Sequence, residues 1–188
     1  MPRSSVLLAL IALAGCDSVG LDRVDERITG AVLTLAPADG GAPIEITATD
    51  ADADGAGFFF SPAFVRLRAG TVYDGSLTLR DGDADLTAEI RDRAETHLAR
   101  VALAPEGAGA SAPTDRESDY TDSDSNGADL PVGLRFRLRV DGDAAGAGTV
   151  DVTLFHFDVG AKTGPDALSD ATDLDVRFPV VYAPPTGA

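Results

Sequence analysis

The chain has 188 residues, in which 31 Asp and Glu side chains outnumber 15 Lys and Arg side chains and leave a formal net charge of −16. A field of that sign repels nucleic acid and anionic lipid headgroups, so the composition excludes nucleic acid as a partner. The same charge attracts cations, and it is equally typical of a surface adapted to salt. The length suits one domain with a hydrophobic core and some longer loops.

Residues 1–15 have the features of a secretory signal peptide, because Arg3 precedes a continuous apolar run over Val6–Leu13 and small residues follow that run. The run is much shorter than the roughly 20 residues that cross a bilayer. The string LAGC at residues 13–16 resembles the lipobox of bacterial lipoproteins. This resemblance implies cleavage before Cys16, a diacylglycerol thioether on its sulfur and an acyl chain such as palmitate on its nitrogen.

Cys16 is the only cysteine, so the mature chain forms no intramolecular disulfide and must be stabilised by its core. We expect a signal peptide over residues 1–15, a lipidated cysteine with a flexible tether over residues 16–27, and a single β domain over residues 28–184. The lipid would anchor the protein to a membrane of the cell envelope. Asp17 resembles the retention signal for the inner membrane of enteric bacteria, so the inner and the outer membrane both stay open.

From residue 28 onwards, short runs rich in Val, Leu, Thr and Phe alternate with Gly, Asp, Asn and Pro clusters, as is typical of β-sandwiches and barrels. Strict alternation predicts two strands with one buried face, over residues 134–140 and 174–182. Weaker strands are expected over residues 28–35, 44–49, 64–68, 72–80, 98–103 and 150–157. Gly40-Gly41 and residues 141–148 are expected to form hairpin connections, the second pairing strand 134–140 with strand 150–157.

One segment follows a helical period instead, because Leu86, Ile90 and Ala94 lie four residues apart after Asp83 and Asp85 as N-cap candidates. We expect a single amphipathic helix of about three turns there. Residues 105–118 are rich in Ala, Gly, Pro and Ser without a period, and they are expected to form a mobile loop.

Several longer strings resemble a family of small Gram-negative envelope lipoproteins whose members are often labelled type 1 periplasmic binding fold superfamily protein. The strings are ITGAVLTLAPADGGAPIEITATDADADG, RLRAGTVYDGSLTLRD, AEIRDRAETH, YTDSDSNGADLPVGL, GTVDVTLFH and TDLDVRFPV. The resemblance implies an Ig-like antiparallel β-sandwich with one short helix. It also implies an outer-membrane TonB-dependent receptor as a partner, which favours the outer membrane. The family label itself implies two α/β lobes, which the strand periods oppose.

Two acidic strings of the form D-x-D-x-[DN]-G match the first half of a calcium loop, in which alternate oxygens converge on the ion. Their candidate ligands are Asp50, Asp52 and Asp54 in the first string, and Asp122, Asp124 and Asn126 in the second. The bidentate glutamate expected at the twelfth position is replaced by Ser61 and Gly133. The alternative is that both strings are acidic turns capped by their own side chains.

His97 and His156 are the only two imidazoles of the chain, and each falls next to the end of an expected strand. Together with a carboxylate such as Glu95 or Asp158 they would form a three-ligand site for zinc or a related transition metal. The alternative is that the two histidines are unrelated and close strand ends by hydrogen bonds.

No sequence motif for a catalytic serine, a metalloprotease or a phosphate-binding loop is found, so we expect no enzymatic activity. The functional hypothesis is a binding or accessory lipoprotein with divalent cations, above all calcium, in its loops. The alternative is capture of zinc or another metal for a TonB-dependent receptor through His97 and His156. A carboxylate-pair hydrolase is a third hypothesis. The aromatic run Phe58-Phe59-Phe60 is expected to form a short strand with at least one ring outward, where it could contact a partner.

Overall fold

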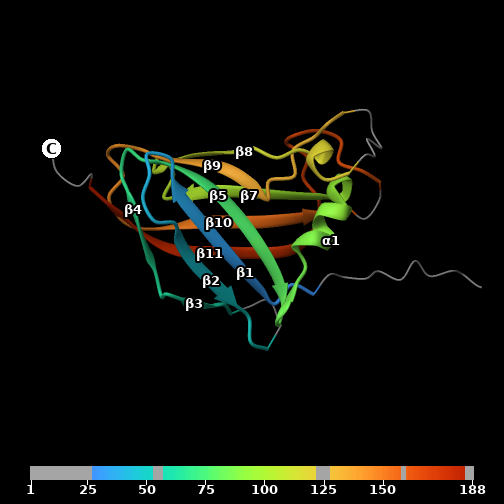
Figure 1. Ribbon diagram of the computed structural model, residues 1–188, viewed down its shortest axis with the longest axis horizontal. Coiled ribbons are helices and arrows are strands. Elements are labelled where there is room, and N and C mark those ends of the chain that lie inside the picture. The colour runs from blue at the N-terminus through green and yellow to red at the C-terminus, as the bar shows by residue number, and fades with distance from the viewer. Residues whose placement is uncertain (1–26, 53–56, 122–127, 158–159, 185–188) are drawn as a thin grey trace, which may run out of the picture.

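The computed structural model describes residues 27–52, 57–121, 128–157 and 160–184, which form two β-sheets packed against each other with one short α-helix at one end (Figure 1). The chain is therefore mainly β, and the predicted fold class is confirmed. The expected signal peptide and Cys16 lie outside the described residues, as does the expected tether apart from Arg27. None of the described helices is long or apolar enough to cross a bilayer.

The larger sheet has seven strands over the described residues. Its main path runs through β3 (Phe59–Ser61), β2 (Ile44–Thr49), β1 (Gly30–Pro37), β5 (Val72–Asp81), β9 (Arg135–Val140) and β8 (Gly109–Pro113), and β6 (Ala84–Asp85) pairs with β5. The β1–β2 hairpin around Gly40-Gly41 is confirmed, with Leu35 opposite Ile44.

The smaller sheet has four strands over the same residues. They lie in the order β4 (Val65–Arg68), β11 (Ala171–Ala183), β10 (Gly146–His156) and β7 (His97–Ala104). Here β4 pairs with β11 in parallel, and this is the one departure from the antiparallel arrangement among the named strands. The remaining elements are the helix α1 (Thr87–Asp92) and two 3₁₀ turns, η1 (Ala94–Thr96) and η2 (Glu117–Asp119).

The core lies between the sheets and is built from the alternating side chains that the sequence predicts. In β9, Phe136, Leu138 and Val140 are buried, while the three arginines that alternate with them are exposed. In β11, every second side chain from Leu174 to Tyr182 is buried. Because a strand turns successive side chains to opposite faces, both patterns place one face against the other sheet.

The predicted hairpin between strands 134–140 and 150–157 is wrong, because β9 and β10 belong to different sheets. β9 pairs with β5 and β8, whereas β10 pairs with β11 and β7. The exposed arginines of β9 therefore meet carboxylates outside β10, as in the 3.0 Å ion pair of Arg137 with Asp74 on β5. A connection rich in Gly and Asp, such as residues 141–148, can form either a hairpin or a crossing between sheets, so the packing of the sheets decides between the two.

Two further predictions need correction. The helix is shorter than expected, because α1 ends at Asp92 and η1 follows it. Its N-cap is Leu86, without a side-chain cap, and not Asp83 or Asp85 as predicted. Asp85, one residue earlier, still accepts the Thr87 N–H through Oδ1 at 2.8 Å. The expected loop over residues 105–118 contains β8, which pairs with β9 over its whole length. Its Ala, Gly and Ser side chains carry little strand preference, so the pairing with β9 decides its conformation.

The Tyr182 hydroxyl links the three longest strands of the smaller sheet, β7, β10 and β11, by hydrogen bonds. Tyr182 lies on β11, and its hydroxyl is 2.9 Å from the Ala104 carbonyl oxygen at the end of β7 and 3.2 Å from the Thr149 carbonyl oxygen on β10. Burial, together with the negative charge of Asp151, raises the pKa of this phenol to about 12. The folded protein therefore keeps the Tyr182 proton at a pH where the unfolded chain loses it.

This pKa predicts a loss of stability in alkali that depends on one hydroxyl. Because the folded pKa of Tyr182 lies above the ordinary value of 10.0, its contribution is fully present below pH 10 and is lost as the pH rises towards 12. We expect the free energy of unfolding in urea to fall over this range in the wild type and to fall less in Tyr182→Phe. Two parallel curves of unfolding free energy against pH would contradict the assignment.

Candidate metal centre

His97 and His156 lie directly opposite each other on neighbouring strands. His97 begins β7, His156 ends β10, and the antiparallel register pairs the two residues. Their ring centroids are 4.7 Å apart. The backbone N–H of Phe157 donates to the Thr96 carbonyl oxygen at 2.9 Å, so the flanking residues carry the backbone hydrogen bond and the histidines form the closer type of cross-strand pair.

The two imidazoles point towards the interior of the sandwich. His97 has the same strand parity as Ala99, and His156 has the same parity as Leu154, and both of these residues are buried between the sheets. The His97 side chain is 0% exposed and the His156 side chain 16% exposed. Figure 1 shows this end of β7 and β10 beside α1. The structure thus brings together the two histidines that the sequence left unplaced relative to each other.

Asp173 completes the cluster from the third strand, and it does so through an irregularity in β11. Leu154 pairs with Leu174 but Phe155 pairs with Thr172, so Asp173 is an extra residue opposite no partner. A bulge of this kind re-aims a side chain and is common beside functional sites. The Asp173 side chain is 10% exposed, although the alternation of β11 alone would turn it to the surface.

Two carboxylate oxygens of Asp173 each face one imidazole. Oδ2 lies 3.4 Å from His97 Nε2, and Oδ1 lies 3.3 Å from His156 Nδ1. One donor atom from each of the three residues can be chosen so that all lie within 4.8 Å of one another. Oδ2 of Asp173 is also buried without a hydrogen bond in the part of the chain that the structure describes.

The other nitrogen of His97 explains why this contact is unusual. Its Nδ1 lies 3.0 Å from the Arg93 carbonyl oxygen and 3.2 Å from the Thr96 hydroxyl oxygen. Because a carbonyl oxygen only accepts, the contact with Arg93 is a hydrogen bond in the tautomer that carries the proton on Nδ1. A neutral imidazole then has a lone pair on Nε2, and that lone pair faces the Asp173 carboxylate. Two lone pairs at this distance repel unless a proton or a metal cation lies between them.

The donor set and its spacing fit a transition-metal ion. Zinc bonds to imidazole nitrogen and carboxylate oxygen of about 2.0–2.1 Å place two tetrahedral donors about 3.3 Å apart. Each of the two nitrogen–oxygen distances is close to this value, and each involves a different oxygen of Asp173. With one donor atom from each residue the spacing is within 4.8 Å, so small side-chain shifts would bring the three donors to one ion. A ligating imidazole commonly donates its second N–H to a backbone carbonyl, as His97 does to Arg93. Three protein ligands would leave one coordination position for water or another ligand.

The carboxylates that the sequence suggested do not take this role among the described residues. Glu95 lies outside the three-residue group, and Asp158 lies outside the described residues. Sequence reasoning missed Asp173 because the alternation of residues 174–182 assigns it to the exposed face. No sequence signal marks the bulge that turns it inward.

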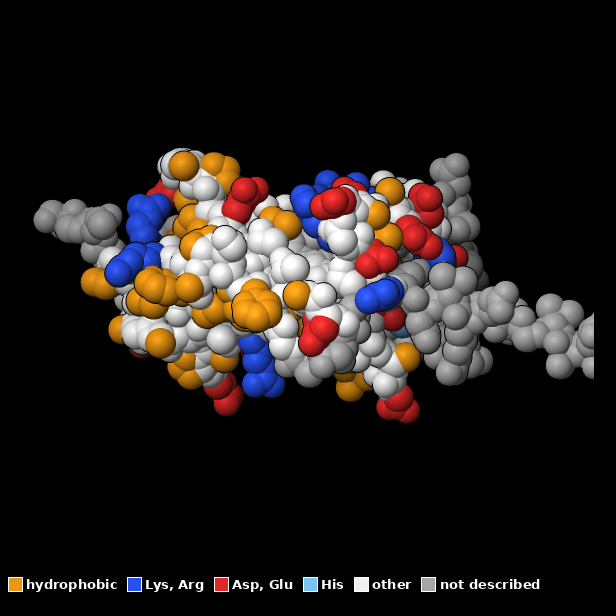
Figure 2. All heavy atoms as spheres, turned by 90° about the horizontal axis from the view of Figure 1, so that it is seen from below, with side chains coloured by type: hydrophobic (Ala, Val, Ile, Leu, Met, Phe, Trp, Pro, Cys, Tyr) orange, Lys and Arg blue, Asp and Glu red, His pale blue; other side chains and the backbone are white. Residues whose placement is uncertain are grey.

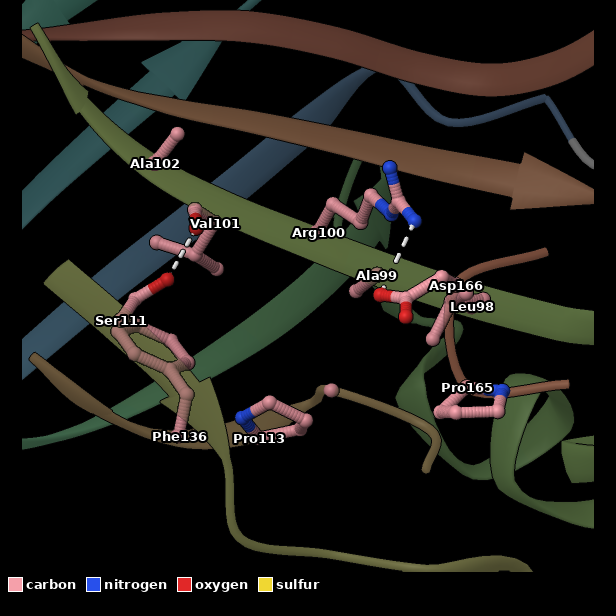
Figure 3. Close-up of a pocket in the computed structure, with 11 residues that line it drawn as sticks. Leu98, Ala99, Arg100, Val101, Ala102, Ser111, Pro113, Phe136, Pro165 and Asp166 are labelled. Carbon is pink, nitrogen blue, oxygen red and sulfur yellow. Dashed lines mark hydrogen bonds and ion pairs between the residues drawn. The ribbon is translucent and has the colours of Figure 1, made fainter. Parts of the chain in front are cut away.

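Two cavities lie near this end of the sandwich. One of about 200 Å³ adjoins Asp173, and it is lined also by Ile28, Phe58, Thr172, Leu174 and Asp175. The other, of about 320 Å³, opens between the edge strands β7 and β8 (Figure 3). Its lining holds the 3.6 Å ion pair of Arg100 with Asp166 and the hydrogen bond from the Ser111 hydroxyl to the Val101 carbonyl oxygen, and none of the three cluster residues belongs to it.

The predicted calcium loops are described only in part. Asp50 directly follows β2; its side chain is buried, and its N–H donates to the Thr29 carbonyl oxygen at 2.8 Å. Asp52 is exposed. Asp54, and Asp122, Asp124 and Asn126 of the second string, lie outside the described residues. Calcium binding therefore stays a prediction.

The aromatic run forms an exposed edge of the larger sheet. Phe59 is 73% exposed on β3, whereas Phe60 packs edge-on against Phe178 with ring centroids 6.0 Å apart. Figure 2 shows hydrophobic side chains gathered on the side of the molecule where β3 and β4 lie. The expectation of one outward ring agrees with this arrangement, and a partner for it stays a prediction.

The fold and the cluster together define a β-sandwich with a candidate metal centre. Comparison of the chain with protein-family models, curated proteins and solved structures finds no match. The resemblance to envelope lipoproteins therefore rests on the sequence strings alone.

Calcium binding by the acidic strings can be tested through thermal stability. If the strings bind calcium, millimolar Ca²⁺ should raise the melting temperature by roughly 3–6 °C at about ten times the Kd, because the ion binds only the folded state. Asp52→Ala with Asp124→Ala should abolish this rise. Asp83→Ala with Asp92→Ala removes the same charge elsewhere and should keep it. Equal melting temperatures with and without Ca²⁺ would leave only the turn interpretation.

Proposed function

We propose that this chain is a non-enzymatic, lipid-anchored protein of the bacterial cell envelope that captures zinc or a related transition metal through His97, His156 and Asp173. The observation that carries the proposal is the buried Asp173 carboxylate, whose two oxygens lie 3.3–3.4 Å from the chain's only two histidines. Metal capture stands first because the fold brings His97, His156 and Asp173 together, and calcium binding by the acidic strings stays a separate prediction.

At the cluster itself, capture is favoured over catalysis by the size of the cavity that Asp173 lines, since the larger cavity between β7 and β8 contains none of the three cluster residues. The cavity beside Asp173 measures about 200 Å³, below the roughly 300–1,000 Å³ of pockets that bury an organic ligand. A hydrated metal ion fits such a space, whereas a glycan or ester substrate would need more room. The side-chain exposures of 16% for His156 and 10% for Asp173 support access for an ion from that side.

The lipid anchor and the receptor are further parts of the proposal. The LAGC string supports acylation of Cys16, and the family resemblance favours the outer membrane and a TonB-dependent receptor as the protein that receives the metal. The net charge of −16 supports attraction of cations to the protein before capture.

Zinc affinity tests the metal centre directly. We expect one Zn²⁺ per chain in equilibrium dialysis, with affinity falling as the pH falls because both imidazoles must be neutral to bind. His97→Ala, His156→Ala and Asp173→Asn should each weaken binding by more than the roughly 10–100-fold that loss of an outer-shell partner costs.

Asp74→Asn is the matched control for Asp173→Asn, because it removes the same charge from an exposed position on β5 in the other sheet, away from the cavity that Asp173 lines. Its zinc affinity should equal that of the wild type. Unchanged stoichiometry and affinity in the His97→Ala, His156→Ala double variant would show that the acidic surface, and not this cluster, binds the ion.

Lipidation makes a separate prediction about covalent structure. Mass spectrometry of the protein extracted from its native membrane should find Cys16 as the first residue, carrying a diacylglycerol thioether and an N-acyl chain. Cys16→Ser should appear with residues 1–15 still attached or as a protein released from the membrane. A native protein with a free thiol at Cys16 would remove the proposed anchor.

A further inference from the structure

Lys162 is the only lysine of the chain, and it is completely buried, whereas the fourteen other basic residues are arginines. Lysine is among the residue types least often buried, and a buried ammonium needs partners for its three N–H bonds. The position of Lys162 in the fold shows where those partners come from. It lies in the loop that joins His156 at the end of β10 to Asp173 near the start of β11.

The ammonium of Lys162 contacts three oxygens from three separate segments. Nζ donates to the Ala94 carbonyl oxygen and to the Pro131 carbonyl oxygen, both at 2.7 Å, and lies 3.2 Å from Oε1 of Glu117. Glu117 is itself buried in η2. Burial lowers the pKa of the Lys162 ammonium, and the negative charge of Glu117 opposes this effect.

The backbone of Lys162 adds a second attachment to the same turn. Its N–H donates to the Glu95 carbonyl oxygen at 2.9 Å, so Lys162 contacts two successive carbonyls of η1. η1 ends at Thr96, directly before His97. The loop between His156 and Asp173 is thereby hydrogen-bonded to η1, the turn that directly precedes His97.

We propose that Lys162 is a positioning residue of the His97–His156–Asp173 cluster, which holds the β10–β11 loop against η1 and so presets the orientation of His97. The effect on zinc affinity rests on the proposed metal site. The effect on the orientation of His97 can be measured in the metal-free protein. Lys162 contacts the backbone at Ala94 and Glu95 and does not need to touch the ion. Loss of the ammonium would let η1 shift, and the 3.0 Å hydrogen bond from His97 Nδ1 to the Arg93 carbonyl oxygen would no longer be held.

The test removes the ammonium without leaving a buried unpaired carboxylate. Lys162→Met alone would strand the Glu117 charge, which is strongly destabilising, so Lys162→Met with Glu117→Gln is measured beside it. Arg100→Met is the matched control, because it removes an exposed ion pair from β7 to Asp166 in the same loop. Circular dichroism establishes that each variant is folded at the assay temperature.

Two readouts separate positioning from a general effect on stability. The first is ¹⁵N NMR of the metal-free protein, where the two imidazoles of the chain give the only ring signals. We expect the wild type and Arg100→Met to keep a protonated, slowly exchanging His97 Nδ1, and the Lys162 variants to show averaged tautomers. The second is Zn²⁺ affinity, which should fall about 10–100-fold in the Lys162 variants and stay unchanged in Arg100→Met.

The outcomes distinguish this inference from the function on which it rests. A wild type without zinc affinity, in which Lys162→Met with Glu117→Gln still changes the His97 signals, would remove the metal function and keep the positioning role. Folded Lys162 variants with wild-type imidazole signals and wild-type affinity would overturn the positioning role and leave the metal site in place.

Discussion

The pairing of β10 with β7 on one side and with β11 on the other is the interaction on which the candidate centre depends. It aligns the end of β10 with the start of both neighbours, so that His156, His97 and Asp173 reach the same end of the smaller sheet. Strand pairing supplies the alignment through backbone hydrogen bonds, which are independent of the side chains that meet there. The sheet therefore sets the positions of these three residues, and their side chains determine the chemistry of its end.

Three local features adjust the positions that strand pairing gives to His97, His156 and Asp173. Asp173 turns inward as the extra residue of β11, His97 Nδ1 lies 3.0 Å from the Arg93 carbonyl oxygen, and Lys162 hydrogen-bonds to the Ala94 carbonyl oxygen of η1. Each of them places a polar or charged group in a buried position, where an unsatisfied group is costly. Their joint occurrence at one end of the molecule argues for a common purpose, because the opposite face of the same sheet carries ordinary exposed arginines and acids.

The proposed lipid anchor and the proposed metal centre complement each other physically. An acidic protein held near a membrane by an acyl chain stays close to a partner in that membrane, which raises its effective concentration there. The cluster is small and partly accessible, as suits an ion that must be both bound and released. In the proposed centre, three protein ligands would leave one coordination position for a ligand from the proposed receptor during transfer.

The alternation of apolar and polar residues in 134–140 and 174–182 determined the mainly β class, because period-two burial depends only on neighbours along the chain. Long-range packing decided what that alternation could not: that β9 and β10 lie in different sheets, and that residues 109–113, with their small side chains, form a strand. The two histidines were recognisable as candidate ligands from their rarity, but only register placed them opposite each other. The sequence did not identify Asp173, because strict alternation in β11 assigns it to the exposed face. It turns inward as an extra residue in the pairing with β10, and only the paired sheet shows that irregularity.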